Sequence, residues 1–301
     1  MNQIYYGELK CQHEPCKNKA YYQLNNKYVC GVHSRNQDRS ELPKRSKREQ
    51  DQIKIGKMNN DLMLIEQYRQ LNINNGKRGN LVLSKMYMMK EPEYIEGYYR
   101  IFPNFKHQNR KDGFGCMKLS PKYLGPVKHG QPGLPDALNI ENLHQSNKCF
   151  QQEVDENGNP TQLFYVNRLK FYTDPVPHRH KYRGTEKNKN IPLYSIWIDK
   201  NGQEHRLTYI ESRQFYCNFY ERLASQQEDF KTLKNLLDNG YNLQICGYDA
   251  NRIEGNEPIN ILIEKEYLNN GRPFGHEKIL YAMLLLEEQD YPWRKYKTFD
   301  F

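Results

Sequence analysis

The residues best spaced for chemistry are three cysteines and a histidine near the N-terminus. Four residues separate Cys11 from Cys16, and two separate Cys30 from His33, with thirteen residues between the two pairs. Zinc takes four thiolate or imidazole ligands in a tetrahedron, commonly as two close pairs. The spacing predicts a structural zinc site, and the alternative is a set of unmetallated side chains. A site closed by four protein ligands has no open position for a substrate.

The segment between the two pairs indicates how such a site would be held. Residues 20–24 and 27–29 are rich in apolar and aromatic side chains and predict two short strands joined at Asn25 and Asn26. A hairpin between ligand pairs is a common way to close a small zinc site. His13 is a spare imidazole that could replace one of the four ligands.

A second group of candidates lies where strands give way to a helix. Residues 193–198 and 205–210 predict two strands joined by a turn, and an amphipathic helix follows from Glu211. The junction places Tyr209 and Arg213 beside Glu211. In an enzyme, Glu211 would be the acid or base. Alternatively, Glu211 caps its helix and pairs with a neighbouring cation.

A loop rich in proline and glycine provides further candidates. Residues 119–135 contain four Pro and three Gly, which exclude regular structure, together with apolar side chains that can pin the loop. Ordered long loops commonly position ligands. His129 and Gln131 are therefore candidate donors to a phosphate or carboxylate. The helical spacing of polar residues that follows, from Asn139 to Asn147, is either functional or the surface of a helix capped by Asp136.

Three further segments supply candidates. His178 and His180 lie in the basic run 177–183, which is a phosphate-binding cluster, a metal-binding pair or a solvated loop. Asp249 follows a buried strand predicted for residues 241–248 and points toward any ligand at that edge of the sheet. His276 stands at the start of the last helix, where free backbone N–H groups favour an anion.

These features predict one pocket for an anionic ligand. Its predicted catalytic residues are Glu211, Arg213 and His276. Its predicted ligand-binding residues are His129, Gln131, His178, His180, Tyr209 and Asp249.

Composition limits the kind of protein. The 301 residues are 37% hydrophobic and 13% aromatic with a formal charge of +9, which predicts a folded, basic protein whose partner is nucleic acid or a nucleotide. Basic clusters at Lys44–Arg48 and Arg179–Arg183 are the expected contacts. The sequence contains no apolar run of about 18 residues, so we expect no membrane-spanning helix. The odd number of cysteines and the polar N-terminus predict reduced thiols in a cytoplasmic or nuclear compartment, not secretion.

The predicted fold class is α+β. We expect a small zinc-stapled module at residues 1–34, a basic linker at 35–58, and a main domain at 59–301 with a mixed sheet and packed helices. The main domain would open with a helix from Asp61 to about Leu71, capped by Asn60. The sequence leaves the oligomeric state open.

Residues 194–223 resemble the NADAR family, which cleaves N-glycosidic bonds in riboflavin intermediates or ADP-ribosyl groups. The matching features are a hairpin glycine and an acidic residue at the head of a helix, carried by Ser195, Trp197, Gly202, Glu211 and Phe219. The zinc knuckle before a basic linker is similar to uncharacterised proteins of large DNA viruses. That resemblance implies no activity, and it implies location in a host cell or a virion.

Three functional hypotheses follow. The first is a zinc-containing, nucleic-acid-associated protein. The second is an enzyme acting on the N-glycosidic bond of a nucleotide or nucleobase compound, with Glu211 as the acid or base. The third is a structural virion or assembly protein.

Overall fold

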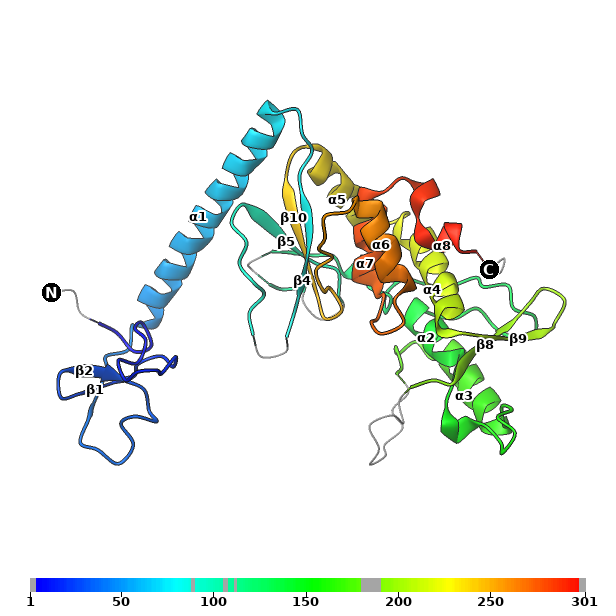
Figure 1. Ribbon diagram of the computed structural model, residues 1–301, viewed down its shortest axis with the longest axis horizontal. Coiled ribbons are helices and arrows are strands. Elements are labelled where there is room, and N and C mark those ends of the chain that lie inside the picture. The colour runs from blue at the N-terminus through cyan, green and yellow to red at the C-terminus, as the bar shows by residue number, and fades with distance from the viewer. Residues whose placement is uncertain (1–3, 88–89, 105–107, 111–112, 180–190, 298–301) are drawn as a thin grey trace. The chain divides into compact units, whose positions relative to one another are not determined.

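The computed structural model describes residues 4–87, 90–104, 108–110, 113–179 and 191–297, and their fold is α+β (Figure 1). The chain divides into two compact units, Met1–Met63 and Leu64–Phe301. In the described part of the chain, no helix is both long and apolar enough to cross a membrane.

The first unit is built on the predicted hairpin. Strands β1 (Tyr22–Leu24) and β2 (Lys27–Val29) pair antiparallel. The turn residues Asn25 and Asn26 have φ values of 47° and 61°, the left-handed conformation that a tight hairpin turn needs and asparagine tolerates. Strand β3 (Ser40–Glu41) pairs with the other edge of β1, so part of the expected linker belongs to this sheet.

Helix α1 (Lys47–Asn74) begins well before the predicted start at Asp61. The reason is a reciprocal cap, in which the Ser46 backbone N–H donates to Glu49 Oε2 at 2.8 Å and the Glu49 N–H donates to Ser46 Oγ at 3.2 Å. This arrangement satisfies two N–H groups that a helix start otherwise leaves unpaired. Much of the basic segment expected as a linker is therefore helical.

The second unit contains a parallel sheet with the strand order β4-β10-β5-β6. Strand β10 is buried along its whole length, as expected of a segment in which apolar and polar residues do not alternate regularly. Because the strands are parallel, their carboxyl ends meet at one edge of the sheet. The strand bounds are Leu81–Lys85 for β4, Tyr98–Phe102 for β5, Phe114–Gly115 for β6 and Asn242–Gly247 for β10.

The second unit also contains an antiparallel sheet that is separate from the parallel one. Two sheets therefore take the place of the single mixed sheet that was expected. The order of the antiparallel sheet is β7 (Lys148–Cys149), β8 (Tyr194–Ile198) and β9 (Glu204–Leu207). Ser195 in β8 pairs with Lys148 on one side and Leu207 on the other. Both edges of β8 are thus occupied inside its own sheet.

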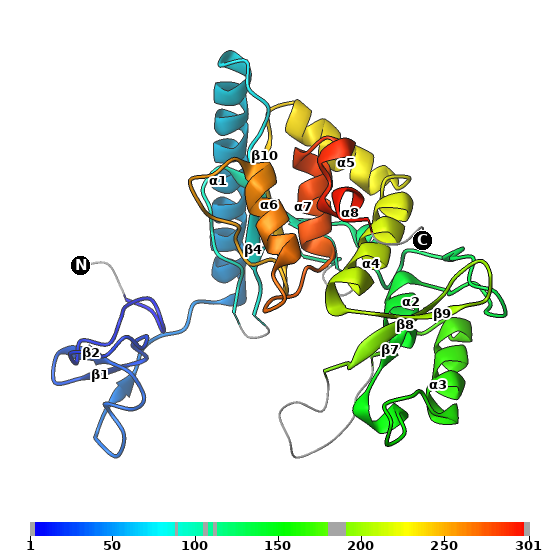
Figure 2. The same cartoon turned by 45° about the vertical axis from the view of Figure 1, so that its right-hand side comes forward.

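Helix α4 (Tyr209–Ala224) connects these layers. It contacts α7 (His276–Leu285), which covers β4 and β10, and it also contacts β8 and β9 of the antiparallel sheet (Figures 1 and 2). The remaining helices are α2 (Ile140–Ser146), α3 (Gln162–Thr173), α5 (Glu228–Asp238), α6 (Ile259–Leu268) and α8 (Pro292–Lys295), with short 3-10 turns at Met117–Leu119, Gln151–Glu153 and Glu288–Asp290.

One expected helix cap differs in the structure. The Asn139 side chain accepts a hydrogen bond from the Asn142 N–H at 2.8 Å, so Asn139 caps α2 in place of Asp136. The observed cap lies three residues after the expected one, because α2 begins at Ile140 and its unpaired N–H groups are within reach of Asn139.

Candidate functional site

The four predicted metal ligands form a cluster in the first unit. The ligand atoms of Cys11, Cys16, Cys30 and His33 all lie within 4.8 Å of one another. The Cys16 and Cys30 sulfurs are 3.8 Å apart, and His33 Nδ1 is 3.4 Å from the sulfurs of Cys11 and Cys30. Tetrahedral zinc would space two sulfurs about 3.8 Å apart and a sulfur and a nitrogen about 3.6 Å apart. The cluster therefore has the dimensions of a metal site.

The surroundings of the cluster favour thiolate ligands. Burial raises the pKa of the Cys30 thiol, but the backbone N–H groups of His33 and Val32 and the Asn18 amide lower it to about 6. His13, the spare imidazole, stacks on the His33 ring with centroids 4.2 Å apart. His13 therefore orients a ligand ring instead of replacing a ligand.

A pocket of about 310 Å³ lies within the second unit, and we call it the α2–α4 pocket. One wall comes from α2, β7 and the following residue, a second from α4, and a third from the carboxyl end of β10 and the segment before α7. It contains three predicted residues, Tyr209, Arg213 and Asp249. The full lining is Glu141, His144, Gln145, Lys148, Phe150, Arg179, Pro192, Tyr209, Arg213, Tyr216, Asp249, Pro273, Phe274 and Gly275.

Lys148 is the most unusual group in the pocket. Burial lowers the pKa of its amine to about 8, even though the nearby Glu141 carboxylate raises it, and Arg179 lowers it further. Its Nζ has no hydrogen bond or ion pair to any part of the chain that the structure describes. At pH 7 the amine is consequently neutral, with an available lone pair, in about a tenth of the molecules, and it is a cation in the rest.

The groups around Lys148 come from one face of α2 and one face of α4. Glu141 accepts from Arg179 Nε at 3.2 Å. Burial holds the pKa of the His144 imidazole well below its usual value, with Lys148 and Arg179 adding to the effect. The buried His144 Nδ1 has no hydrogen-bond partner within the described residues. Burial raises the pKa of the Tyr216 phenol, and the ring of Tyr216 lies 4.6 Å from that of His144.

Asp249 reaches the pocket from the carboxyl edge of the parallel sheet, where ligands of parallel α/β sheets commonly bind. Two glycines make room for acidic groups here. A Cβ on Gly275 would lie 3.3 Å from Asp249 Oδ2 and 3.1 Å from Glu277 Oε2, and a Cβ on Gly247 would lie 2.1 Å from Glu277 Oε1. The two carboxylates are therefore close to one another: Asp249 lines the pocket, and Glu277 lies behind its wall.

Glu211 does not line the pocket. Its carboxylate accepts from the Thr208 backbone N–H at 2.7 Å, and its own N–H donates to Thr208 Oγ1 at 3.3 Å. This reciprocal pair is a capping box at the start of α4. The structure thus gives Glu211 the capping role that was the alternative to catalysis.

Replacing Glu211 tests that role. Glu211→Ala should reduce the free energy of unfolding by about 1 kcal/mol, because one N–H at the start of α4 loses its acceptor. Glu211→Gln should cost much less, since an amide oxygen can accept the same bond. Chemical denaturation measures both. A Glu211→Gln variant that is fully stable but no longer forms the adduct at Lys148 would show that Glu211 is a catalytic residue.

Arg213 and His276 hold the backbone around the pocket. Arg213 is buried and donates to the carbonyl oxygens of Tyr267, Asn269 and Arg272, where the end of α6 leaves carbonyls without helical partners. His276 Nε2 donates a hydrogen bond to the Pro103 carbonyl oxygen at 2.7 Å, and His276 does not line the pocket. Both predicted catalytic residues therefore have positioning roles in the structure.

His129 and Gln131 also lie away from the pocket and are buried. The Gln131 side-chain oxygen accepts from Arg168 at 2.6 Å and from the Ile198 N–H at 3.0 Å, and its amide donates to the Tyr172 hydroxyl at 2.8 Å. His129 Nε2 lies 2.8 Å from the Pro135 carbonyl oxygen. The proline-rich loop is ordered as expected, but its polar groups bond inside the protein and are not available to a ligand.

The two remaining predicted residues are His178 and His180. His178 Nε2 is 2.5 Å from Asp174 Oδ2, and its ring stacks on Phe171. The contact with Asp174 fixes the His178 ring beside α3, outside the pocket lining. His180 lies outside the residues that the structure describes.

Sequence reasoning did not assign Glu141, His144 or Lys148 as functional, although it noted the polar helical spacing that contains His144. That polarity was the available signal, because Glu141 and His144 share one face of α2 and Lys148 follows directly. Lys148 carried no signal of its own. Its lowered pKa arises from burial among residues distant in sequence.

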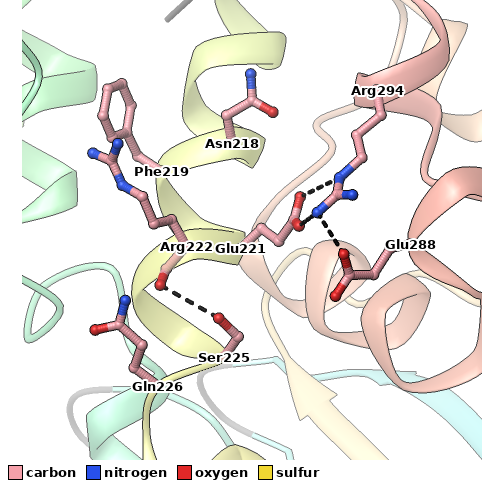
Figure 3. Close-up of a pocket in the computed structure, with 8 residues that line it drawn as sticks. All are labelled: Asn218, Phe219, Glu221, Arg222, Ser225, Gln226, Glu288 and Arg294. Atoms are coloured by element: carbon pink, nitrogen blue, oxygen red, sulfur yellow. Dashed lines mark hydrogen bonds and ion pairs between the residues drawn. The ribbon is translucent and has the colours of Figure 1, made fainter.

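A second hollow of about 400 Å³ lies on the outer side of α4. Three of its charged groups pair with one another, and Figure 3 shows Arg294 between Glu221 and Glu288. The Trp293 indole also donates to Glu221 at 2.6 Å, and Arg222 donates to the Lys128 carbonyl at 2.8 Å. These contacts anchor α8 to α4, so we assign this hollow to architecture.

Comparisons of the chain with protein-family models, curated proteins and solved structures give no match.

Proposed function

We propose that the α2–α4 pocket binds an anionic, nucleotide-type N-glycoside and hydrolyses its N-glycosidic bond. The observation that carries the proposal is the Lys148 amine, whose pKa is lowered to about 8 in a pocket that also contains two carboxylates. Titratable groups perturbed by burial beside charged partners in a concave site are typical of reactive groups.

The lining fits this class of ligand. Three cations, Lys148, Arg179 and Arg213, outnumber the carboxylates of Glu141 and Asp249, which favours a substrate with negative charge. Aromatic and proline side chains complete the walls and suit the flat face of a nucleobase. The volume of about 310 Å³ lies at the lower end of the range for small-molecule sites.

The proposed chemistry uses the amine as a nucleophile. The Lys148 lone pair forms a bond to the anomeric carbon of the sugar, and the bond from that carbon to the base breaks. The base leaves with the bonding electrons and takes a proton. Water then hydrolyses the sugar–lysine adduct, which releases the sugar and restores the amine. Glu141 and Asp249 line the same pocket as groups able to donate and accept the protons.

The resemblance of residues 194–223 to the NADAR family favours the same reaction class. In that resemblance Glu211 is the acidic residue at the head of the helix. Since Glu211 caps α4, we propose that Lys148 and the pocket carboxylates carry the chemistry, and that the hairpin and α4 position them.

Reductive trapping tests the proposal. Ribose 5-phosphate, whose open form is an aldehyde, should condense with the neutral Lys148 amine, and borohydride should fix the adduct at a peptide containing Lys148. The yield should rise with half-maximum near pH 8, because only the deprotonated amine reacts. An ordinary lysine would require a pH near about 10.4. Peptide mass spectrometry locates and quantifies the adduct.

The control variants are Lys148→Arg, which keeps the cation but lacks a nucleophilic amine, and Lys200→Arg at an exposed site. The first should abolish the specific adduct, and the second should leave it unchanged. Adducts spread evenly over exposed lysines, or a half-maximum above pH 10, would refute the proposal.

For the first unit, we propose that the Cys/His cluster holds a zinc ion with a structural role. The distances support a tetrahedral ion, and three sulfurs with one imidazole are a donor set that zinc prefers. The cluster uses all four coordination positions, so the ion would stabilise the fold. The seven cysteines form no disulfide with one another, which fits the reducing compartment expected from their odd number.

A further inference from the structure

The positive charge of the chain is concentrated in the first unit. Residues 1–63 contain twelve Lys and Arg against seven Asp and Glu, a formal charge of +5. The remaining 238 residues contain 33 against 29, a formal charge of +4. A bound zinc ion with three thiolates would lower the first value by one. The first unit therefore remains the more basic part of the chain per residue.

The predicted basic cluster at Lys44–Arg48 accounts for only part of this charge. Lys44 pairs with Glu41 at 3.0 Å, and Arg45 pairs with Glu8 at 2.7 Å. The Arg45 guanidinium also lies 4.0 Å from the centre of the Tyr5 ring. These two cations hold the N-terminal segment against the module, so they are less available to a partner than the sequence indicated.

A second group of cations, Lys10, Lys17 and Lys19, forms no ion pair within the described part of the first unit. Lys10 and Lys19 form an isolated antiparallel bridge beside the metal cluster. The flanking hydrogen bonds run from the Cys11 N–H to the Asn18 carbonyl and from the Ala20 N–H to the Leu9 carbonyl, both 2.7 Å long. Lys10 and Lys19 are thus a non-hydrogen-bonded pair. In antiparallel strands this kind of pair brings directly opposite side chains closest together.

Two like charges directly opposite one another destabilise an antiparallel pair. Lys10 and Lys19 are both exposed, as is Lys17 next to the metal ligand Cys16. Within the described residues, no acidic side chain forms an ion pair with any of these three lysines. Unfavourable local arrangements that the protein does not offset, such as this pair of like charges, are expected at surfaces that bind a partner.

We propose that Lys10, Lys17 and Lys19 form a surface that binds the phosphate backbone of nucleic acid. Closely spaced phosphates would neutralise the repulsion between Lys10 and Lys19 and release counterions from the nucleic acid. The candidate metal ligands Cys11 and Cys16 directly adjoin Lys10 and Lys17 in the sequence. This surface is independent of the α2–α4 pocket.

The test measures binding of labelled 20-nucleotide single-stranded and duplex DNA and RNA to the full chain over a series of salt concentrations. The variant is Lys10→Gln with Lys19→Gln, and the matched control is Lys200→Gln with Lys234→Gln on the second unit. Loss of two phosphate contacts should reduce the slope of log affinity against log salt by about 1.8 on duplex DNA and by about 1.4 on single strands. These changes correspond to about 30-fold and about 15-fold in affinity at 0.15 M salt. The control should keep the slope of the unmodified chain.

Metal content and melting temperature establish that the variant is folded. The Lys10/Lys19 variant should melt no lower than the unmodified chain, because it loses a repulsion. Equal loss in both double variants would overturn the proposal, since it would indicate only a general charge effect. Absence of oligonucleotide binding at low salt, or loss confined to binding of anionic lipid vesicles, would also overturn it.

Discussion

Removing the metal is expected to unfold the first unit while the second unit stays folded. The apolar cluster of the first unit consists of Cys11, Val29 and Cys30, with Cys16, Tyr22 and Leu24 packed beside it. Three of these six side chains are proposed metal ligands, so little hydrophobic burial would remain without the ion. Structural zinc contributes about 10–16 kcal/mol of apparent binding free energy in small zinc modules. Chelation should therefore abolish amide exchange protection in β1 and β2.

Single substitutions should reproduce the effect of chelation. Cys11→Ser or Cys30→Ser should reduce the metal content from one ion per chain to near none and remove the same protection. Cys149→Ser, which makes the same chemical change in the second unit, should retain the full metal content. Protein purified without chelators that contains no metal, or β1 and β2 amides that stay protected after chelation, would contradict the zinc assignment.

Gly125→Ala is expected to destabilise the second unit by about 3 kcal/mol. An added Cβ would lie 2.2 Å from the Leu138 carbonyl oxygen and 2.9 Å from the Asn139 Cα, which are backbone atoms that cannot rotate aside. The Leu124 carbonyl accepts from the Ile140 N–H at 2.9 Å, so the same strain reaches the start of α2. Helix α2 carries Glu141 and His144, and the substitution should also reduce trapping at Lys148.

The measurement is thermal unfolding, where a loss of this size lowers the melting temperature of a unit with more than 200 residues by roughly 10 °C. Gly56→Ala provides a control of opposite sign. Gly56 lies within α1, and an added Cβ would contact no heavy atom within 4 Å. The control should gain about 0.5–1 kcal/mol from improved helix propensity. Equal stability of the two variants would show that the proline-rich loop does not pack closely on α2.

The sequence by itself determined the elements whose geometry depends on near neighbours. The spacing of Cys11, Cys16, Cys30 and His33 predicted the cluster, because a hairpin with left-handed Asn25 and Asn26 brings the two pairs together. The β8–β9 hairpin followed from its turn residues, and the buried strand β10 followed from the lack of regular alternation between apolar and polar residues. Sequence also placed Tyr209 and Arg213 together at the junction between strand and helix, and both line the α2–α4 pocket.

Only the tertiary structure decided which polar side chains face a ligand and which face the protein. In sequence, His129 and Gln131 resemble residues that donate to a ligand. In the structure, the Gln131 side-chain oxygen instead accepts hydrogen bonds from Arg168 of α3 and from the backbone of β8. Lys148 resembles any other lysine until α2, α4 and the β10 edge enclose it. A hydrogen bond or a lowered pKa depends on partners and burial supplied by segments far apart in the chain. Local residue types therefore fixed the elements, whereas the packing of distant segments fixed the chemistry.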